Sequence, residues 1–340
     1  MNAKQIVFTA VNKAELIEHP LPPLTPTQVM VKTAVSTISC GTEKANITGD
    51  PNVSIMAGAD VSFPRSSGYS SAGVVVAVGD AVKEVKVGDR VAMFWSKHQD
   101  YNIVDETSVV KIEDESVGFD TAAMCFIASF SMAAIRKTRL EMGESAVVMG
   151  LGILGIIAVK LLRVAGAMPI IAVDPNPARR QTALESGADY AFDPFAADFV
   201  EKVKAVTDGG VNVAIEVTGV GAGFNQALDC LKKFGRVTLL GCTRNADFKV
   251  DYYRKIHAPG ITVIGANTAA RPAQESYPGY FTHKDDISAI MRLVAGGRLD
   301  LASLVEETHS PKECGEVYRR LVEDKAFPIA VQFNWNDLEA

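Results

Sequence analysis

Three glycines, Gly150, Gly152 and Gly155, have the spacing of a loop that binds the pyrophosphate of a dinucleotide. They follow a short apolar run, 145–149, and precede a long one, 156–165, so a strand is expected to lead into the loop and a helix to leave it. Glycine permits the tight turn and the close approach to phosphate, and the helix N-terminus offers unpaired N–H groups. The pattern predicts a site for a nicotinamide or flavin nucleotide; the other interpretation is a structural glycine turn. The residues expected at the phosphates are Gly150, Gly152, Ile153, Leu154 and Gly155.

Asp174 ends the next apolar run, 19 residues after Gly155. An acid at this position accepts hydrogen bonds from the ribose hydroxyls and repels a 2'-phosphate, which favours NAD over NADP. Arg179 and Arg180 follow closely and suit either a 2'-phosphate or solvent.

Further cofactor contacts are expected where other parallel strands end, because ligands of an open sheet bind at the carboxyl ends of its strands. Three apolar runs end in small residues that are typical of such turns. The residues expected there are Thr218, Gly219, Gly241 and Gly265.

The elements that position these residues follow from the hydrophobic pattern. The first third is rich in β-branched runs and turns, and after residue 119 strands and helices alternate, which is typical of a doubly wound parallel α/β sheet. The expected strands are 29–35, 73–78, 90–94, 145–149, 170–173, 190–192, 211–217, 236–240, 262–265 and 329–333, and the expected helices are 121–137, 156–165, 177–186, 197–207, 223–232, 284–296 and 311–323. The last strand is expected to return to the first domain.

Composition limits the classes of partner. The 340 residues carry a net charge of -6 without a basic tract, so we expect a small-molecule substrate, with no nucleic acid and no membrane as partner. The N-terminus lacks a basic segment followed by an apolar one, and we expect a cytoplasmic protein. Five cysteines without a CxxC pair do not predict a disulfide framework.

Several segments resemble the medium-chain dehydrogenases/reductases of the zinc-type alcohol dehydrogenase superfamily. They are 40–43 (CGTE), 73–79 (GVVVAVG), 87–91 (VGDRV), the glycine loop and 235–241 (GRVTLLG). The resemblance implies a GroES-like β-rich catalytic domain, residues 1–122 and 267–340, with a Rossmann domain, 123–266, inserted in it and the active site in the cleft. It also implies a homodimer or homotetramer. The segments 41–43 and 68–73 and the lone His98 are similar to the branch that includes bacteriochlorophyllide a dehydrogenase.

The chain departs from this family at the metal. Cys40 and Cys125 match two ligands of the catalytic zinc, and Glu43 stands where the family has an aspartate, but Tyr69 replaces the histidine ligand. The four cysteines of a structural zinc are also missing from 90–104. A catalytic zinc needs three protein ligands and a water. The sequence therefore leaves two alternatives for zinc binding. Either Glu43 or His98 completes the ligand set of a catalytic zinc, or Cys40 and Cys125 are small buried residues inherited from a zinc-binding ancestor.

Removal of a hydroxyl proton requires a base or a metal. Thr42 matches the hydroxyl that relays this proton in the family, whereas the relay histidine is replaced by Ala45. Tyr69 is a candidate acid, and His98, after the strand 90–94, is a candidate base; the alternative for each is a structural hydrogen bond.

We therefore expect an NAD-dependent oxidoreductase that interconverts a secondary alcohol and a ketone by hydride transfer. A polyol or sugar derivative is favoured because few bulky apolar residues adjoin the motifs. One alternative is a zinc-independent NAD(P)H reductase of enones or quinones. The other is a non-catalytic nucleotide-binding subunit.

Overall fold

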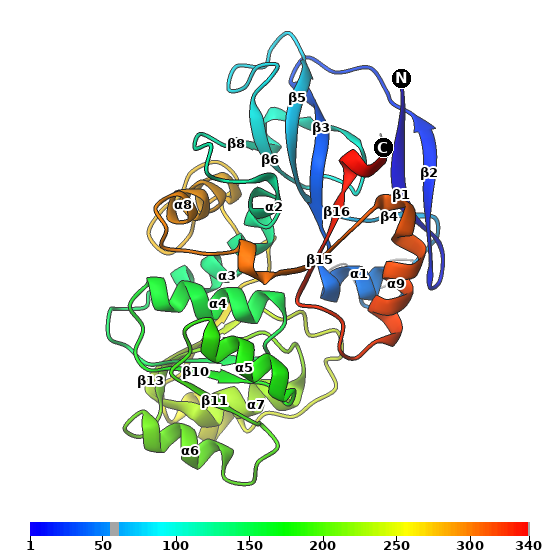
Figure 1. The fold of residues 1–340 in the computed structure, drawn as a ribbon. Helices are drawn as coiled ribbons and strands as arrows, with labels where there is room; N and C mark the ends of the chain where they lie inside the picture. The colour runs from blue at the N-terminus through cyan, green and yellow to red at the C-terminus, as the bar shows by residue number, and fades with distance from the viewer. Residues whose placement is uncertain (55–60, 339–340) are drawn as a thin grey trace. The chain divides into compact units, whose positions relative to one another are not determined.

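The computed structural model describes residues 1–54 and 61–338 and divides the chain into two compact units. Unit 1 comprises residues 1–127 and 287–340, and unit 2 comprises residues 128–286. Both ends of the chain belong to unit 1, in blue and red in Figure 1. The division therefore falls after Ile127 and after Asp286, where the sequence predicts it after 122 and 266.

Unit 2 is built on a six-stranded parallel sheet, in agreement with the predicted doubly wound α/β fold. The strand order is β11-β10-β9-β12-β13-β14, so β9 lies at the centre with β10 and β12 on its two sides. The strands are β9 (Ala146–Met149), β10 (Ile170–Val173), β11 (Tyr190–Phe192), β12 (Val211–Glu216), β13 (Leu231–Leu239) and β14 (Thr262–Gly265).

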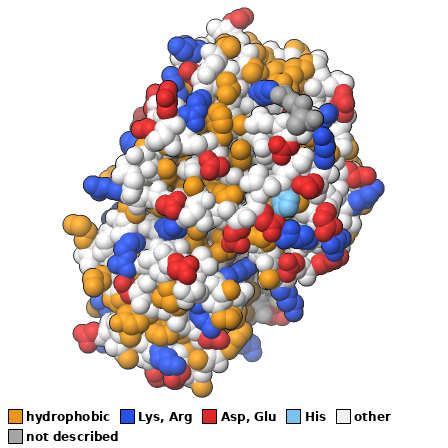
Figure 2. All heavy atoms as spheres, in the orientation of Figure 1, with side chains coloured by type: hydrophobic (Ala, Val, Ile, Leu, Met, Phe, Trp, Pro, Cys, Tyr) orange, Lys and Arg blue, Asp and Glu red, His pale blue; other side chains and the backbone are white. Residues whose placement is uncertain are grey.

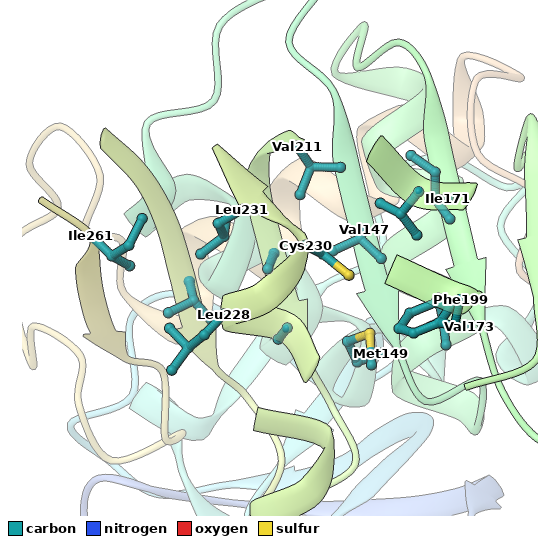
Figure 3. Close-up of a cluster of buried hydrophobic side chains, with 14 residues drawn as sticks. Val147, Met149, Ile171, Val173, Phe199, Val211, Leu228, Cys230, Leu231 and Ile261 are labelled. Atoms are coloured by element: carbon teal, nitrogen blue, oxygen red, sulfur yellow. The ribbon is translucent and has the colours of Figure 1, made fainter. Parts of the chain in front are cut away.

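Helices bury the apolar faces of this sheet. Val147, Val173 and Phe199 belong to one buried cluster, and Figure 3 shows Phe199, from the first turn of its helix, beside Val173. Burial of a whole side chain of this kind stabilises the fold by about 1.5–3 kcal/mol. The helical elements of unit 2 are α4 (Ile153–Val164), α5 (Pro177–Glu185), α6 (Phe199–Val206), α7 (Gly221–Cys230) and the π-helix η2 (Tyr253–His257), while α3 (Cys125–Thr138) and α8 (His283–Ala295) run from one unit into the other.

Unit 1 contains a seven-stranded sheet and a three-stranded sheet. The larger has the order β15-β16-β3-β5-β6-β8, with β7 also pairing with β3, and the smaller has the order β2-β1-β4. The last strand of the chain, β16, pairs antiparallel with β3, so the predicted return of the C-terminal strand to the first domain is confirmed. The strands are β1 (Asn2–Ala10), β2 (Lys13–Pro20), β3 (Gln28–Thr37), β4 (Arg65–Ser66), β5 (Ser70–Val78), β6 (Arg90–Phe94), β7 (Tyr101–Asp105), β8 (Val109–Lys111), β15 (Val305–His309) and β16 (Ala330–Asn334).

Short helices pack on these sheets. One of them, α9, buries Val317, Tyr318 and Leu321 in a cluster with Phe8 of β1 and Phe333 of β16, so the C-terminal segment completes the core of the first domain. The helices of unit 1 are α1 (Cys40–Ile47), α2 (Phe119–Ala122) and α9 (Cys314–Glu323), and the 3-10 turns are η1 (Glu106–Ser108), η3 (Ala302–Leu304), η4 (Pro311–Glu313) and η5 (Trp335–Leu338).

Buried charges explain why residues 267–286 belong to unit 2. The Asp286 carboxylate lies 2.8 Å from Nε of Arg136 and 2.6 Å from Nη1 of Arg271. Arg271 also donates to the backbone oxygen of Ser129, and Lys137 Nζ donates to the oxygens of Gly265 and Ala270 at 3.0 Å and 2.7 Å. Arg136, Lys137 and Ser129 all belong to α3. The segment after β14 is thus attached to α3, because charges removed from water need partners.

Figure 2 shows acidic and basic side chains mixed over the visible face. Within the described ranges, no helix is both long and apolar enough to cross a membrane.

Candidate functional site

The glycine loop, 150–152, joins β9 to α4. Gly150 has φ 95°, a conformation that favours glycine, and a Cβ on Gly155 would overlap the oxygen of Gly150. Gly152 is the N-cap of α4, and a Cβ there would meet no atom within 4 Å. The first-turn N–H groups of an α-helix have no intrahelical partner. The loop therefore leaves room and hydrogen-bond donors for a phosphate group.

Asp174 follows β10 and is buried, with both carboxylate oxygens hydrogen-bonded to backbone. Oδ2 accepts from the N–H of Leu151 at 2.9 Å, and Oδ1 accepts from the N–H of Asn176 at 2.8 Å. The acid thus lies against the glycine loop. Arg180 donates from Nη1 to the backbone oxygens of Asp174 and Pro175, at 2.7 Å and 2.9 Å.

The turns after β12 and β13 lie at the same edge of the sheet. A Cβ on Gly150 would lie 3.0 Å from Cγ2 of Thr218, and a Cβ on Gly219 would lie 2.6 Å from the oxygen of Cys242. The backbone oxygen of Glu216 accepts from the N–H of Gly241 at 2.9 Å. The structure thus brings together three turns that the sequence assigns to the cofactor. Gly265 ends β14, one of the two edge strands of this sheet, and Arg179 is half-exposed in the first turn of α5.

Glu216 is a residue of this edge that the sequence analysis missed. It is the last residue of β12 and its carboxylate accepts from the N–H groups of Thr218 and Gly219. The available signal is the same as for Asp174: an acidic residue closes an apolar strand.

A buried polar network occupies unit 1. Oε1 of Glu43 accepts from the N–H of Ser39 at 2.8 Å, and Oε2 lies 3.0 Å from Nε2 of His98 and accepts from the hydroxyl of Tyr318. Nδ1 of His98 lies 2.7 Å from Oγ of Ser36. Burial opposes ionisation of Glu43, but the charge and hydrogen bond of His98 and the hydrogen bond of Tyr318 outweigh it and lower the pKa of the carboxyl.

His98 is fully buried, whereas a base that receives a proton from a substrate is expected to be accessible. Gly68 makes room for it, because a Cβ there would lie 2.6 Å from Cγ of the imidazole. Both ring nitrogens are within hydrogen-bonding distance of protein oxygens, on Ser36 and Glu43. The ring therefore has no exposed atom toward a substrate in this structure, and its catalytic assignment stays a prediction.

Tyr69 lies in an aromatic cluster that the sequence did not indicate. Its ring is 5.6 Å from that of Phe126 and 6.1 Å from that of Trp95, between centroids, and Phe94 contacts Phe126 at 5.4 Å. The Tyr69 hydroxyl donates to Oγ of Ser39. Trp95 is 50% exposed and has φ 58°, a backbone conformation uncommon for a bulky residue. The expectation of few bulky apolar residues near the motifs is wrong, because these rings come from segments far apart in sequence.

Thr42 lies in α1, half-exposed, and its hydroxyl forms no hydrogen bond with the described residues. Cys40 begins the same helix. Cys125 is buried, and its thiol donates to the oxygen of Thr121 at 3.4 Å.

Two family models match this chain. "Alcohol dehydrogenase GroES-like domain" covers residues 25–138, and "Zinc-binding dehydrogenase" covers residues 154–283. The chain belongs to the zinc-type alcohol dehydrogenase superfamily. It is an oxidoreductase, as members of this NAD(P)-dependent superfamily are. The finer resemblance to the bacteriochlorophyllide a dehydrogenase branch stays a prediction.

Relatives within the superfamily span nearly the whole chain. L-threonine 3-dehydrogenase of Pyrococcus abyssi is 26% identical over 88% of this chain and 88% of that protein. Sorbitol dehydrogenase of Bacillus subtilis is 24% identical over 95% of each chain. The crystal structure of 2R,3R-butanediol dehydrogenase from Bacillus subtilis superposes with a TM-score of 0.81 at 23% identity, over 98% of this chain and 99% of that one. This last likeness shows the fold.

The residues of this superfamily member do not fit the zinc that the family name implies. Across the part of the chain that the structure describes, no three His, Cys, Asp or Glu side chains are grouped so that they could hold a metal ion. Cys40, Glu43 and Cys125 therefore do not form the expected ligand set. Both oxygens of Glu43 accept hydrogen bonds from protein groups, and burial raises the pKa of the Cys125 thiol to about 12. Zinc binds the thiolate form of cysteine.

Proposed function

We propose that this protein is an NAD-dependent oxidoreductase that interconverts a secondary alcohol and a ketone, with a polyol or sugar derivative as the first substrate class to test. One observation carries the cofactor assignment: the buried carboxylate of Asp174 lies against the glycine loop, at the position that selects NAD. The names of the sorbitol and butanediol dehydrogenases among its relatives support a substrate with neighbouring hydroxyl groups.

The bound nicotinamide would supply the hydride acceptor or donor. The protein would hold the nucleotide through the first-turn N–H groups of α4 and through Asp174. Thr218, Gly219, Gly241 and Gly265 are proposed to line the ribose and the nicotinamide, as the family resemblance implies. Alcohol oxidation releases a hydride from carbon and a proton from oxygen, and this proton needs an acceptor in the protein.

Tyr69 and Thr42 are the proposed hydroxyls that handle this proton. Tyr69 is half-exposed and hydrogen-bonded to Ser39, so its phenol oxygen is held in place. Ser39 in turn donates its N–H to Glu43. We propose His98 as a residue that acts through Glu43 and Ser36, which it contacts, because its ring is buried.

A second candidate function is a zinc-independent NAD(P)H reductase of enones or quinones. The aromatic cluster of Tyr69, Phe94, Trp95 and Phe126 favours it, because flat conjugated rings pack well against aromatic faces. Asp174 argues against its NADPH-dependent form.

A substrate panel separates these functions. The purified protein is assayed with NAD⁺ and sorbitol, 2,3-butanediol or L-threonine, and with NADH or NADPH and a cyclic enone or a benzoquinone. The proposal predicts NAD⁺-dependent oxidation of at least one alcohol. Turnover of enones or quinones alone would favour the reductase. Tight NADH binding without turnover of any of these compounds would contradict the proposed substrate class.

A further inference from the structure

Glu216 is a buried carboxylate that the proposed reaction does not use. It ends β12 and is 1% exposed. The strand register places it beside Met149 of β9 and Leu239 of β13, where three neighbouring parallel strands end. A carboxylate removed from water loses its hydration and requires hydrogen-bond donors in the protein.

The turn after β12 provides all the side-chain hydrogen bonds of Glu216 that the structure describes. Oε1 accepts from the N–H of Thr218 at 2.8 Å, from the Thr218 hydroxyl, and from the N–H of Gly219 at 3.2 Å. Oε2 accepts from the same Gly219 N–H at 3.2 Å. Burial raises the pKa of Glu216, while these hydrogen bonds oppose that rise.

The turn held by Glu216 packs directly against the glycine loop. A Cβ added to Gly150 would lie 3.0 Å from the methyl carbon of Thr218. Gly219 has φ 66°, and a Cβ there would lie 2.6 Å from the backbone oxygen of Cys242, so a larger residue does not fit at this position. The Glu216 backbone oxygen binds the next turn through the N–H of Gly241. One residue therefore connects the turns that follow β9, β12 and β13.

We infer that Glu216 is a positioning residue for the cofactor: its carboxylate fixes the 217–219 turn, and through Thr218 the glycine loop, in the conformation that receives the nucleotide. The inference rests on the proposed function in one respect, that a nucleotide binds at this edge. A preorganised loop loses less conformational entropy on binding. Removal of the carboxylate should therefore weaken binding more than it slows chemistry.

Four variants test this role. Glu216→Gln removes the charge and replaces one of the two acceptor oxygens by an NH2 donor, Thr218→Val removes the hydroxyl but keeps the shape, and Thr218→Ser keeps the hydroxyl. Glu144→Gln is the matched control, because Glu144 is a hydrogen-bonded carboxylate just before β9, at the opposite end of the strands. The readouts are NADH affinity by fluorescence titration, kcat at saturating nucleotide, and amide hydrogen exchange of residues 217–221 in the nucleotide-free protein.

Glu216→Gln and Thr218→Val should each raise the Kd for NADH about tenfold, the effect of losing hydrogen bonds to a charged group. Thr218→Ser keeps the hydroxyl that bonds to Glu216 but lacks the methyl beside Gly150, so it should bind NADH more tightly than Thr218→Val, and kcat should change less than Kd. Exchange of the turn's amides should accelerate in Glu216→Gln. Glu144→Gln should bind NADH as the wild type does.

The inference is wrong if Glu216→Gln shows wild-type affinity and wild-type exchange. If Glu216→Gln does not fold, equal affinities of Thr218→Val and Thr218→Ser overturn it. A wild-type protein that binds neither NADH nor NADPH contradicts the proposed function instead. Exchange in the nucleotide-free variant then still decides whether the carboxylate fixes the turn.

Discussion

Asp174 and Glu216 show how acidic side chains shape the cofactor edge at the scale of single residues. Each is buried where an apolar strand ends, and each accepts hydrogen bonds from the backbone of a turn. Asp174 could be predicted from its spacing to the glycine loop. Glu216 has no position in that spacing pattern, and its role depends on which turns the strand order brings together.

Replacing Asp174 by alanine tests the choice of nucleotide. Loss of the carboxylate removes an acceptor for ribose hydroxyls and the charge that repels a 2'-phosphate. Asp174→Ala should raise the Kd for NADH about tenfold, and the difference between its affinities for NADH and NADPH should become smaller. Fluorescence titration with both nucleotides measures this, with Asp193→Ala as the control because Asp193 pairs with Arg180 nearby. Unchanged discrimination would exclude the ribose assignment.

Tyr69 is proposed to act in chemistry rather than in nucleotide binding. Tyr69→Phe keeps the ring in its aromatic cluster and removes only the hydroxyl that bonds to Ser39. Turnover should fall about a hundredfold, in the range of general acid–base catalysis, while NADH affinity stays near wild type. Steady-state kinetics and a binding titration are compared with Tyr190→Phe, a tyrosine of β11. Wild-type turnover would place the proton transfer elsewhere.

Replacing His98 by alanine tests whether this histidine has a structural or a catalytic role. His98→Ala would leave the buried Glu43 without the imidazole beside it. Loss of one hydrogen-bond partner of a buried polar group costs about 1–3 kcal/mol of the free energy of unfolding. Urea unfolding of both proteins measures the loss. A variant that unfolds like wild type but has lost turnover would show that His98 acts in catalysis.

At the scale of elements, most of the fold follows from hydrophobic pattern. The strands 170–173, 190–192 and 262–265 are found with the predicted bounds, and the other elements of the alternating region differ from their predicted bounds by a few residues. The helix expected from 156 begins at Ile153, because Gly152 acts as its N-cap and the glycines conceal the start. The strand expected from 236 begins at Leu231, where the register with β12 is irregular.

The contacts between residues that are distant in sequence could not be predicted from local sequence patterns. Arg271 has the sequence context of a solvated loop, yet it is buried against Asp286 and Ser129. His98 likewise lies after a predicted strand but turns inward into the space left by Gly68. In both cases the partner is distant in sequence, and local patterns contain no information about it.

The contact between β15 and α9 predicts a specific pH dependence of stability. Glu307 binds Arg320 through both oxygens, at 2.8 Å and 2.9 Å. The hydrogen bonds of Arg320 and then of His309 lower the pKa of Glu307 to about 2, from an ordinary value of 4.5. A lowered folded-state pKa adds stability above the unfolded pKa, and this stability is lost as the pH falls from about 4.5 towards about 2.

Glu307→Gln should therefore be less stable than wild type at neutral pH, and the difference should shrink through that acidic range. Urea midpoints at several pH values measure it. Glu115→Gln, at an exposed carboxylate, is the control. A difference that stays constant with pH would contradict the role of Glu307.

For the whole molecule, we propose a homodimer or homotetramer, as the family resemblance implies. In unit 2, β14 is an edge strand, and its Val263 is 39% exposed. An uncovered edge is a template for pairing with another chain, and two-fold symmetry makes a second copy the simplest partner.

A charge on this strand should prevent such pairing. Val263→Arg is expected to shift the protein to a smaller species in analytical ultracentrifugation. Val78→Arg, at another valine exposed to a similar degree, is the control because it lies on β5 of unit 1. An unchanged sedimentation coefficient in Val263→Arg would place the contact on another surface.

We propose hydride transfer between a secondary alcohol and NAD as the reaction of this protein. Its most direct test uses sorbitol, 2,3-butanediol and L-threonine deuterated at their carbinol carbons, with NAD⁺ and mass spectrometry of the nucleotide. At least one of these alcohols should give NADH that carries a single deuterium, together with a ketone product. Absence of transfer from every alcohol, together with transfer from deuterated NADPH to an enone, would contradict it.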